Sequence, residues 1–285
     1  MPTTTRARHR QPVPQPRAGN RRGLWLAVAA GAALLALLLA WPLARVAYQS
    51  LGGAPAPSRV AAIRPPVLLM TALPLVWGEG GGFDPTSRPA TIYTALKREF
   101  TLKPIDALDA QSLGEAPTLL LIQPRWLAPK ELVALDAWVR AGGRALVLTD
   151  PTLNWPSDLP LGDIRRPPPV GLLAPLLSHW GLALSAGPDG NLSLPFAGKR
   201  RLTLDTPGRF TVTGDTCKVM ESWLAECRLG KGRALLLADA DLVRDELWFG
   251  SGSGSGEGRT ADNPLVLADL LDRLAGLDRP RIEPR

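Results

Sequence analysis

The sequence feature that most restricts the possible structures of this chain is a run of uncharged residues from Gly23 to Ala44. A helix over these roughly 22 residues, at about 1.5 Å per residue, is long enough to cross the hydrocarbon core of a membrane. Trp25 and Trp41 lie near its ends, where indole rings favour the membrane interface. The run predicts a transmembrane helix at 23–44, in contact with the lipid bilayer. A cleaved signal peptide is the alternative, although its apolar core is usually only about 7–15 residues long.

The basic residues before this run predict its orientation. Residues 1–22 form a tail that has six arginines and no acidic residue. Because positive loops stay in the cytoplasm, we expect a single-pass signal anchor in the inner membrane with a cytoplasmic N-terminus and a periplasmic or other extracytoplasmic main domain. The rest of the chain has 33 − 6 = 27 basic and 26 acidic residues. This balance lacks the basic excess of a nucleic-acid-binding protein, so we predict no nucleic-acid partner.

Two cysteines, Cys217 and Cys227, are too few for a zinc site, and we predict no metal and no cofactor. The midpoint between them is Ser222. A hairpin that turns there places the two cysteines opposite each other, where an oxidising compartment would allow a disulfide. Two buried reduced thiols are the alternative.

The rest of the sequence predicts a linker and one large domain. Residues 45–66 are rich in small residues and proline, as in an extended linker. Residues 67–277 alternate between short apolar runs and amphipathic segments, and residues 278–285 form a polar tail. Strands are expected at 67–71, 118–123, 144–149, 182–185, 209–213, 217–220 and 233–238, and helices at 90–100, 129–141, 170–180 and 264–275.

This alternation favours an α/β fold with a parallel sheet covered on both faces. We predict a three-layer domain of the flavodoxin-like or glutamine-amidotransferase-like type. Residues 186–232 have the short runs and turn residues of β structure, so we expect a β-hairpin insertion there.

Ligands of open α/β sheets bind beyond the carboxyl ends of the strands, and three polar segments follow predicted strands. The first is the loop from Trp77 to Arg88, the second is Asp150, and the third is the stretch from Ala238 to Asp241. The candidate ligand-binding residues in these segments are Glu79, Gly80, Gly81, Asp84, Asp150, Asp239 and Asp241.

None of these segments has the spacing of a phosphate-binding or dinucleotide-binding loop, and we find no nucleophile elbow. We therefore assign no catalytic residue. The aspartates have an alternative role as turn and cap residues.

Three segments carry a resemblance to a known family. They are LPLVWGEGGG at 73–82, ELVALDAWVRAGGRALVLTDP at 131–151, and GKGRALLLADADLV at 230–243 followed by DNPLVLADLLDRLAG at 262–276. They resemble the auxiliary component of gliding-motility-type ABC transport systems and related bacterial membrane-anchored domains. The resemblance implies an amidotransferase-like domain without its nucleophile, with ABC-type permease and ATPase subunits as partners.

Three functions compete on this basis. The first is a non-enzymatic accessory subunit of an ABC-type transport complex that binds a partner or envelope ligand. The second is an envelope-acting hydrolase that uses Glu79, Asp84 and Asp150 as paired carboxylates. The third is a small-ligand sensor that uses the cleft around Trp77–Arg88.

Overall fold

The computed structural model describes residues 64–79, 87–196, 200–249 and 261–277. The predicted tail at 1–22, the predicted span at 23–44, nearly all of the predicted linker, and the tail at 278–285 lie outside these ranges. Among the described residues, no helix has the length and apolar character needed to span a membrane. Pro66, placed at the end of the predicted linker, is the first residue of a strand.

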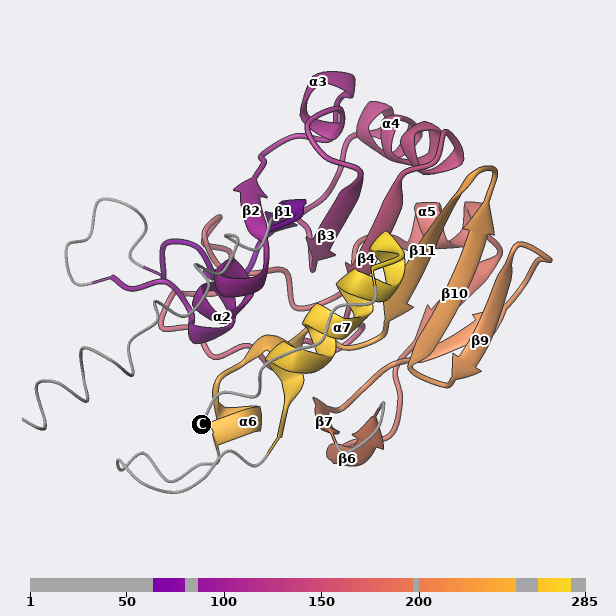
Figure 1. The fold of residues 1–285 in the computed structure, drawn as a ribbon. Coiled ribbons are helices and arrows are strands. Elements are labelled where there is room, and N and C mark those ends of the chain that lie inside the picture. The colour runs from indigo at the N-terminus through magenta and orange to yellow at the C-terminus, as the bar shows by residue number, and fades with distance from the viewer. Residues whose placement is uncertain (1–63, 80–86, 197–199, 250–260, 278–285) are drawn as a thin grey trace, which may run out of the picture. The chain divides into compact units, whose positions relative to one another are not determined.

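The core of the domain is a seven-stranded sheet in the order β2-β1-β3-β4-β11-β10-β9 (Figure 1). The strands from β2 to β11 in this order pair in parallel, whereas β10 and β9 pair antiparallel to their neighbours. Numbered along the chain, the parallel strands follow the order 2-1-3-4-5 of flavodoxin-like sheets. The bounds of the sheet strands are Pro66–Thr71 (β1), Thr101–Pro104 (β2), Thr118–Ile122 (β3), Arg144–Leu148 (β4), Cys217–Glu221 (β9), Leu224–Leu229 (β10) and Gly232–Leu237 (β11).

Helices cover both faces of this sheet, and the predicted α/β class is confirmed. Helices α2 (Thr91–Glu99) and α7 (Asn263–Ala275) contact each other, and α7 crosses the front of β4 and β11 in Figure 1. Helices α3 (Ala110–Leu113) and α4 (Pro129–Arg140) also contact each other, and α4 packs against β11. Every residue of β3 is buried, as expected for a central parallel strand.

Local signals explain where the helices begin and end. Helix α4 begins with Pro129, and the Glu131 carboxylate accepts the N–H groups of Ala128 and Leu108 at 2.9 and 3.2 Å. Helix α7 ends at Gly276, which has the left-handed conformation that glycine adopts without strain. The remaining helical elements are α5 (Ala174–His179), the 3₁₀ turn η1 (Asp241–Val243) and α6 (Glu246–Phe249).

The region at 186–232 is larger than the single β-hairpin insertion that we predicted. It contains a hairpin of β6 (Asn191–Phe196) and β7 (Arg200–Asp205), and a strand β8 (Arg209–Val212) that pairs with β5 (Leu182–Ser185). It also supplies β9 and β10, which extend the central sheet. The apolar runs were visible in the sequence, but strand pairing depends on contacts between distant segments.

The hairpin of β9 and β10 places Cys217 directly opposite Cys227, and the two residues form a disulfide. Replacing both cysteines with serine is expected to lower the free energy of unfolding by about 2–3 kcal/mol, because the bridge restricts a short loop of the unfolded chain. Urea unfolding measures this loss. Dithiothreitol should produce a similar loss in the unmodified protein and no further loss in the variant, and equal stability of the two oxidised proteins would contradict the prediction.

Candidate functional site

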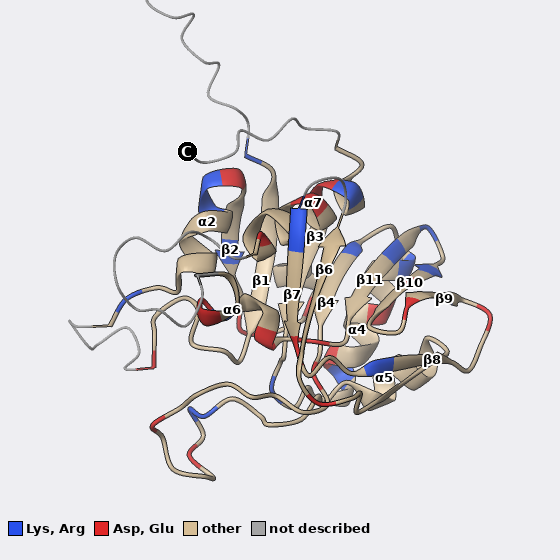
Figure 2. Cartoon of the chain, turned by 90° about the horizontal axis from the view of Figure 1, so that it is seen from below, with Lys and Arg blue, Asp and Glu red and all other residues tan. Residues whose placement is uncertain are grey.

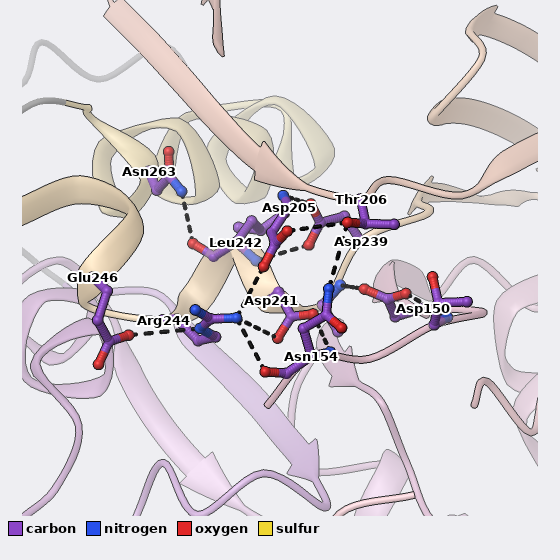
Figure 3. Close-up of polar contacts among 12 residues, drawn as sticks. Asp150, Asn154, Asp205, Thr206, Asp239, Asp241, Leu242, Arg244, Glu246 and Asn263 are labelled. Atoms are coloured by element: carbon purple, nitrogen blue, oxygen red, sulfur yellow. Dashed lines mark hydrogen bonds and ion pairs between the residues drawn. The ribbon is translucent and has the colours of Figure 1, made fainter. Parts of the chain in front are cut away.

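The carboxyl ends of β4 and β11 bring three candidate residues together, and Figure 3 shows Asp150, Asp239 and Asp241 in one network of polar contacts. Asp150 follows β4, whereas Asp239 and Asp241 follow β11, the strand that pairs with β4. All three side chains are fully buried. We call these residues the aspartate cluster.

Asp150 connects the loop after its own strand to the loop after β11. Its Oδ1 accepts the backbone N–H of Thr152 at 2.8 Å, and its Oδ2 accepts that of Ala240 at 3.1 Å. The backbone of Asp150 is in turn held by buried Gln123, whose Oε1 accepts the Asp150 N–H at 2.8 Å. The Gln123 amide also donates to the carbonyl oxygens of Asp150 and Pro168, both at 3.2 Å.

Asp239 joins the β11 loop to the β6–β7 hairpin. Its Oδ1 accepts the N–H of Leu242 at 2.8 Å, and its Oδ2 accepts the N–H of Asp205 at 2.7 Å. Asp205 is the last residue of β7. One carboxylate therefore fixes the 3₁₀ turn η1 relative to the end of a hairpin that is more than thirty residues away in the sequence.

Asp241 and Arg244 complete the network. The Asp241 Oδ2 accepts the N–H of Asn154 at 2.6 Å, and its Oδ1 lies 3.5 Å from the Arg244 guanidinium. The same guanidinium pairs with Asp205 at 3.0 Å and donates to the carbonyl of Asn154 at 3.1 Å. Arg244 thus stabilises negative charge at the edge of the aspartate cluster.

Burial changes the acidity of all three aspartates. It raises the pKa of Asp150 to about 7, although the N–H groups of Thr152 and Ala240 oppose this change. Burial raises the pKa of Asp241 to about 6, partly opposed by the N–H of Asn154 and by Arg244. Burial also raises the pKa of Asp239 well above its usual value, and the nearby charge of Asp150 adds to this effect.

These contacts correspond to the turn and cap role that was the alternative for these aspartates. A general acid or base must come within hydrogen-bond reach of its substrate, but the cluster is buried and its oxygens receive backbone N–H groups and Arg244. Within the described ranges, no group of three or more His, Cys, Asp or Glu residues is arranged to hold a metal ion. The aspartate cluster fixes the loops after β4, β7 and β11 relative to one another.

The other candidate, Glu79, lines a cleft of about 270 Å³ beyond the ends of β1 and β2, and Asp150 is not among the residues that line it. Arg125, from the loop after β3, and Arg165, from the loop after β4, also line this cleft. Glu79 Oε2 accepts the N–H of Asp158 at 3.4 Å, whereas its buried Oε1 accepts no hydrogen bond from a described residue. The candidates Gly80, Gly81 and Asp84 lie outside the described residues.

The loops around this cleft are tied to one another and expose apolar side chains. The Arg125 guanidinium donates to the carbonyl oxygens of Arg165 and Arg166 at 3.1 and 3.2 Å, which joins the loops after β3 and β4. We call the exposed apolar side chains of these loops the apolar rim. Its members and their exposed fractions are Trp77 (63%), Trp126 (69%), Leu161 (85%) and Ile164 (82%).

The sequence pointed to some parts of this site and not to others. Gln123 directly follows β3 in the structure, but the predicted strand at 118–123 included it, so the sequence did not single it out. Arg125 and Arg165 lie in loops 40 residues apart, and no local pattern brings them to one cleft. The nine tryptophans are scattered along the sequence, which favours core or interface positions for most of them. Trp180, Trp223 and Trp248 are buried, whereas Trp77 and Trp126 are exposed.

Comparison with solved structures gives only weak likenesses. The chain is 13% identical to the mmIFT52 N-terminal domain over 76% of this chain and 100% of that one, with a TM-score of 0.48. It is 10% identical to the cytoplasmic protein STM1381 from Salmonella typhimurium LT2, over 73% of this chain and 99% of that one, with a TM-score of 0.44. It is 13% identical to a beta-galactosidase from Bacillus circulans sp. alkalophilus, over 75% of this chain and 31% of that one, with a TM-score of 0.41. Because each score is below 0.5, these likenesses carry no argument about function.

Sequence comparison is more informative. No curated protein matches the chain. Residues 64–187 match the family described as "ABC-type uncharacterized transport system". The matched segment begins just before β1 and ends just after β5, so it includes the loops that line the cleft and the first residue of the aspartate cluster. The match supports a relationship of this domain to the auxiliary components of ABC-type transport systems.

Proposed function

We propose that the protein is a membrane-anchored, non-enzymatic accessory subunit of an ABC-type transport complex. The match of residues 64–187 to an ABC-type transport family carries this proposal. The apolar run at 23–44 would be the anchor, and the resemblance to gliding-motility-type auxiliary components and to amidotransferase-like domains is part of the same proposal. The internal role of the aspartate cluster agrees with a function other than catalysis.

An extracytoplasmic position of the domain is part of the proposal. The arginines of residues 1–22 favour a cytoplasmic tail. The Cys217–Cys227 disulfide fits an oxidising compartment such as the periplasm. Both features support a position of the folded domain on the outer side of the inner membrane.

The apolar rim is the surface that we assign to the partner. Tryptophan and arginine are the residues most enriched at the energetic centres of protein interfaces. Here Trp77 lines the cleft together with Arg125 and Arg165, and Trp126 follows Arg125 in the chain. An exposed cluster of this composition on loops is typical of a surface that another protein covers.

Crosslinking in membranes tests this assignment. Full-length protein, tagged and recovered after mild crosslinking, is expected to bring ABC-type permease or ATPase subunits with it. The double variant Trp77→Ala/Trp126→Ala should lose most of that recovery, at least about tenfold, because removing hot-spot side chains costs roughly 2 kcal/mol each.

The control is Val133→Ala, since Val133 is 69% exposed but lies on α4. It should leave the recovery unchanged. Recovery of the unmodified protein alone, as a monomer, would contradict the accessory role. Undiminished recovery of the complex with the double tryptophan variant would contradict only the assigned surface.

A small-ligand sensor is the second candidate function, and one observation favours it. The buried Oε1 of Glu79 has no hydrogen-bond donor among the described residues and lies at a cleft that also contains Arg165. A ligand with a donor group would satisfy this oxygen. Thermal-shift screening with cationic and hydroxylated compounds would detect it as a rise in Tm that Glu79→Gln reduces.

A further inference from the structure

Three arginines lie directly opposite one another across neighbouring strands. Arg144 of β4 pairs with Arg233 of β11, which pairs with Arg228 of β10. Opposite residues of paired strands point to the same face of a sheet, so these side chains form one row, which we call the arginine row. Like charges in this arrangement destabilise a sheet. A bound anion would offset that cost.

Among the described residues, two arginines of the row have no acidic partner that would neutralise their positive charge. Arg233 donates to the carbonyl oxygens of Arg273 and Leu274 at the end of α7, which accounts for its position. Arg144 and Arg228 form no salt bridge with any acidic side chain in the described part of the chain.

A shallow pocket of about 380 Å³ lies along this row. Its charged lining residues are Arg144, Arg228, Lys231, Arg233 and Glu226. Four cations and one carboxylate make it a site for an anion.

Further basic residues lie toward the same end of the parallel strands as this pocket, although they do not line it. Arg64 precedes β1, Lys97 and Arg98 end α2, and Arg273 lies in the last turn of α7. Figure 2 shows blue segments at the ends of α2 and α7 and around the turn between β10 and β11. The aspartate cluster, by contrast, lies at the opposite ends of the strands.

Favourable interaction with helix dipoles explains only part of this distribution. Cations are common near helix C-termini, where they stabilise the partial negative charge. This accounts for Lys97, Arg98 and Arg273, and for Arg233 through its contact with α7. It does not account for Arg144 and Arg228, which lie on strands.

We propose that the arginine row and Lys231 bind the phosphate groups of anionic lipids. The ends of β4, β10 and β11 that carry the row would then lie on the membrane surface. The inference rests on the proposed anchor at 23–44. About 20 residues separate that anchor from β1 and can extend to roughly 70 Å, so the linker alone does not set the orientation of the domain. Attraction between basic side chains and anionic headgroups, which acts within about 10 Å, would set it. The apolar rim, at the other end of the strands, would then face away from the bilayer.

Lysine acetylation of the full-length protein in nanodiscs tests the inference. Lys231 reports on the arginine row, and Lys130, exposed at the start of α4, is an internal control at the opposite ends of the strands. Residues 1–63 contain no lysine, so the basic tail does not contribute to the signal. Phosphatidylglycerol discs are expected to lower the labelling of Lys231 at least about threefold relative to phosphatidylcholine discs at low salt. The labelling of Lys130 should not change, and about 0.5 M NaCl should abolish the difference.

Arg144→Gln/Arg228→Gln is the test variant and Arg201→Gln/Arg209→Gln, at two exposed arginines outside the row, is the matched control. The test variant relieves like-charge repulsion, so it should remain folded while losing the lipid-dependent protection of Lys231. The control variant should keep that protection. Equal labelling of Lys231 in both lipids, with the protein retained in the discs, would overturn the inference and leave the anchor intact.

Two other outcomes would overturn it for different reasons. Recovery of the protein outside the discs would overturn the anchor together with the inference. Equal protection of Lys231 by inorganic phosphate in phosphatidylcholine discs would identify a soluble anion as the ligand of the arginine row.

Discussion

The folded domain is expected to become more stable as the pH falls from 7.5 to 5. Burial raises the pKa of Asp150 to about 7 and that of Asp241 to about 6, from an ordinary value near 3.8, and it raises the pKa of Asp239 as well. The folded state therefore binds protons in this pH range that the unfolded state does not bind. Linkage requires stability to rise as these protons bind and to be lost as the pH rises through the folded-state pKa values.

The size of this effect follows from the pKa changes. Each unit of difference corresponds to about 1.4 kcal/mol, so the free energy of unfolding should increase by roughly 2–4 kcal/mol between pH 7.5 and pH 5. Aspartates with lowered pKa values, such as Asp136 and Asp163, act in the opposite direction, but only below about pH 4. Urea unfolding of the full-length protein, followed by tryptophan fluorescence at several pH values, measures the change.

A variant distinguishes the aspartate cluster from other titrating groups. Asp150→Asn/Asp241→Asn should flatten the slope of stability against pH between 5 and 7.5. Asp163→Asn should leave this slope unchanged, because the Arg165 side chain and backbone N–H lower the pKa of Asp163 to about 2. If the free energy of unfolding of the unmodified protein instead rises with pH between 5 and 7.5, these three aspartates are ionised throughout that range.

Replacement of Asp239 by alanine is expected to cost about 3–5 kcal/mol of the free energy of unfolding. The change leaves the N–H groups of Asp205 and Leu242 without their acceptor in a fully buried position. Each unsatisfied buried donor costs about 1–3 kcal/mol, and the missing carboxylate leaves a cavity. Burial disfavours the ionised form of this carboxyl group, so its removal offsets part of this cost.

Two comparisons make this experiment specific. Asp239→Asn keeps one acceptor oxygen and should cost less than Asp239→Ala. Asp158→Ala, at an exposed position in the loop after β4, should change stability by less than about 0.5 kcal/mol. An Asp239→Ala protein that is as stable as the unmodified protein at pH 5 would show that this carboxylate does not hold the loops together.

Stability also separates a structural role of the aspartate cluster from a catalytic one. A catalytic carboxylate often destabilises the folded protein, so its removal leaves the free energy of unfolding unchanged or higher. The bonds of Asp150 and Asp239 to backbone N–H groups predict the opposite. A stable Asp150→Ala protein would therefore return attention to the hydrolase alternative, which uses Asp150.

Much of the central sheet followed from the sequence because its strands are buried on both faces. Runs such as VLLMT at 67–71 and TLLLI at 118–122 are apolar at almost every position, and each forms a strand within a residue or two of the predicted bounds. The edge strand β2 was not predicted. Its four residues, TLKP, are all exposed or half-buried and carry no such pattern. An edge strand is defined by its pairing with β1, which only the folded chain provides.

The sequence by itself determined the class of the fold, the positions of its main helices, and the three polar segments that follow strands. Hydrophobic periodicity and helix-ending glycines act over a few residues, so they can be read without knowledge of the fold. Only the tertiary structure decided that Asp150 and Asp239 serve the backbone of distant loops, and that Arg125 and Arg165 meet at one cleft. It also placed Arg144, Arg228 and Arg233 in one row. These outcomes depend on strand order and register, and both are set by the packing of the whole domain.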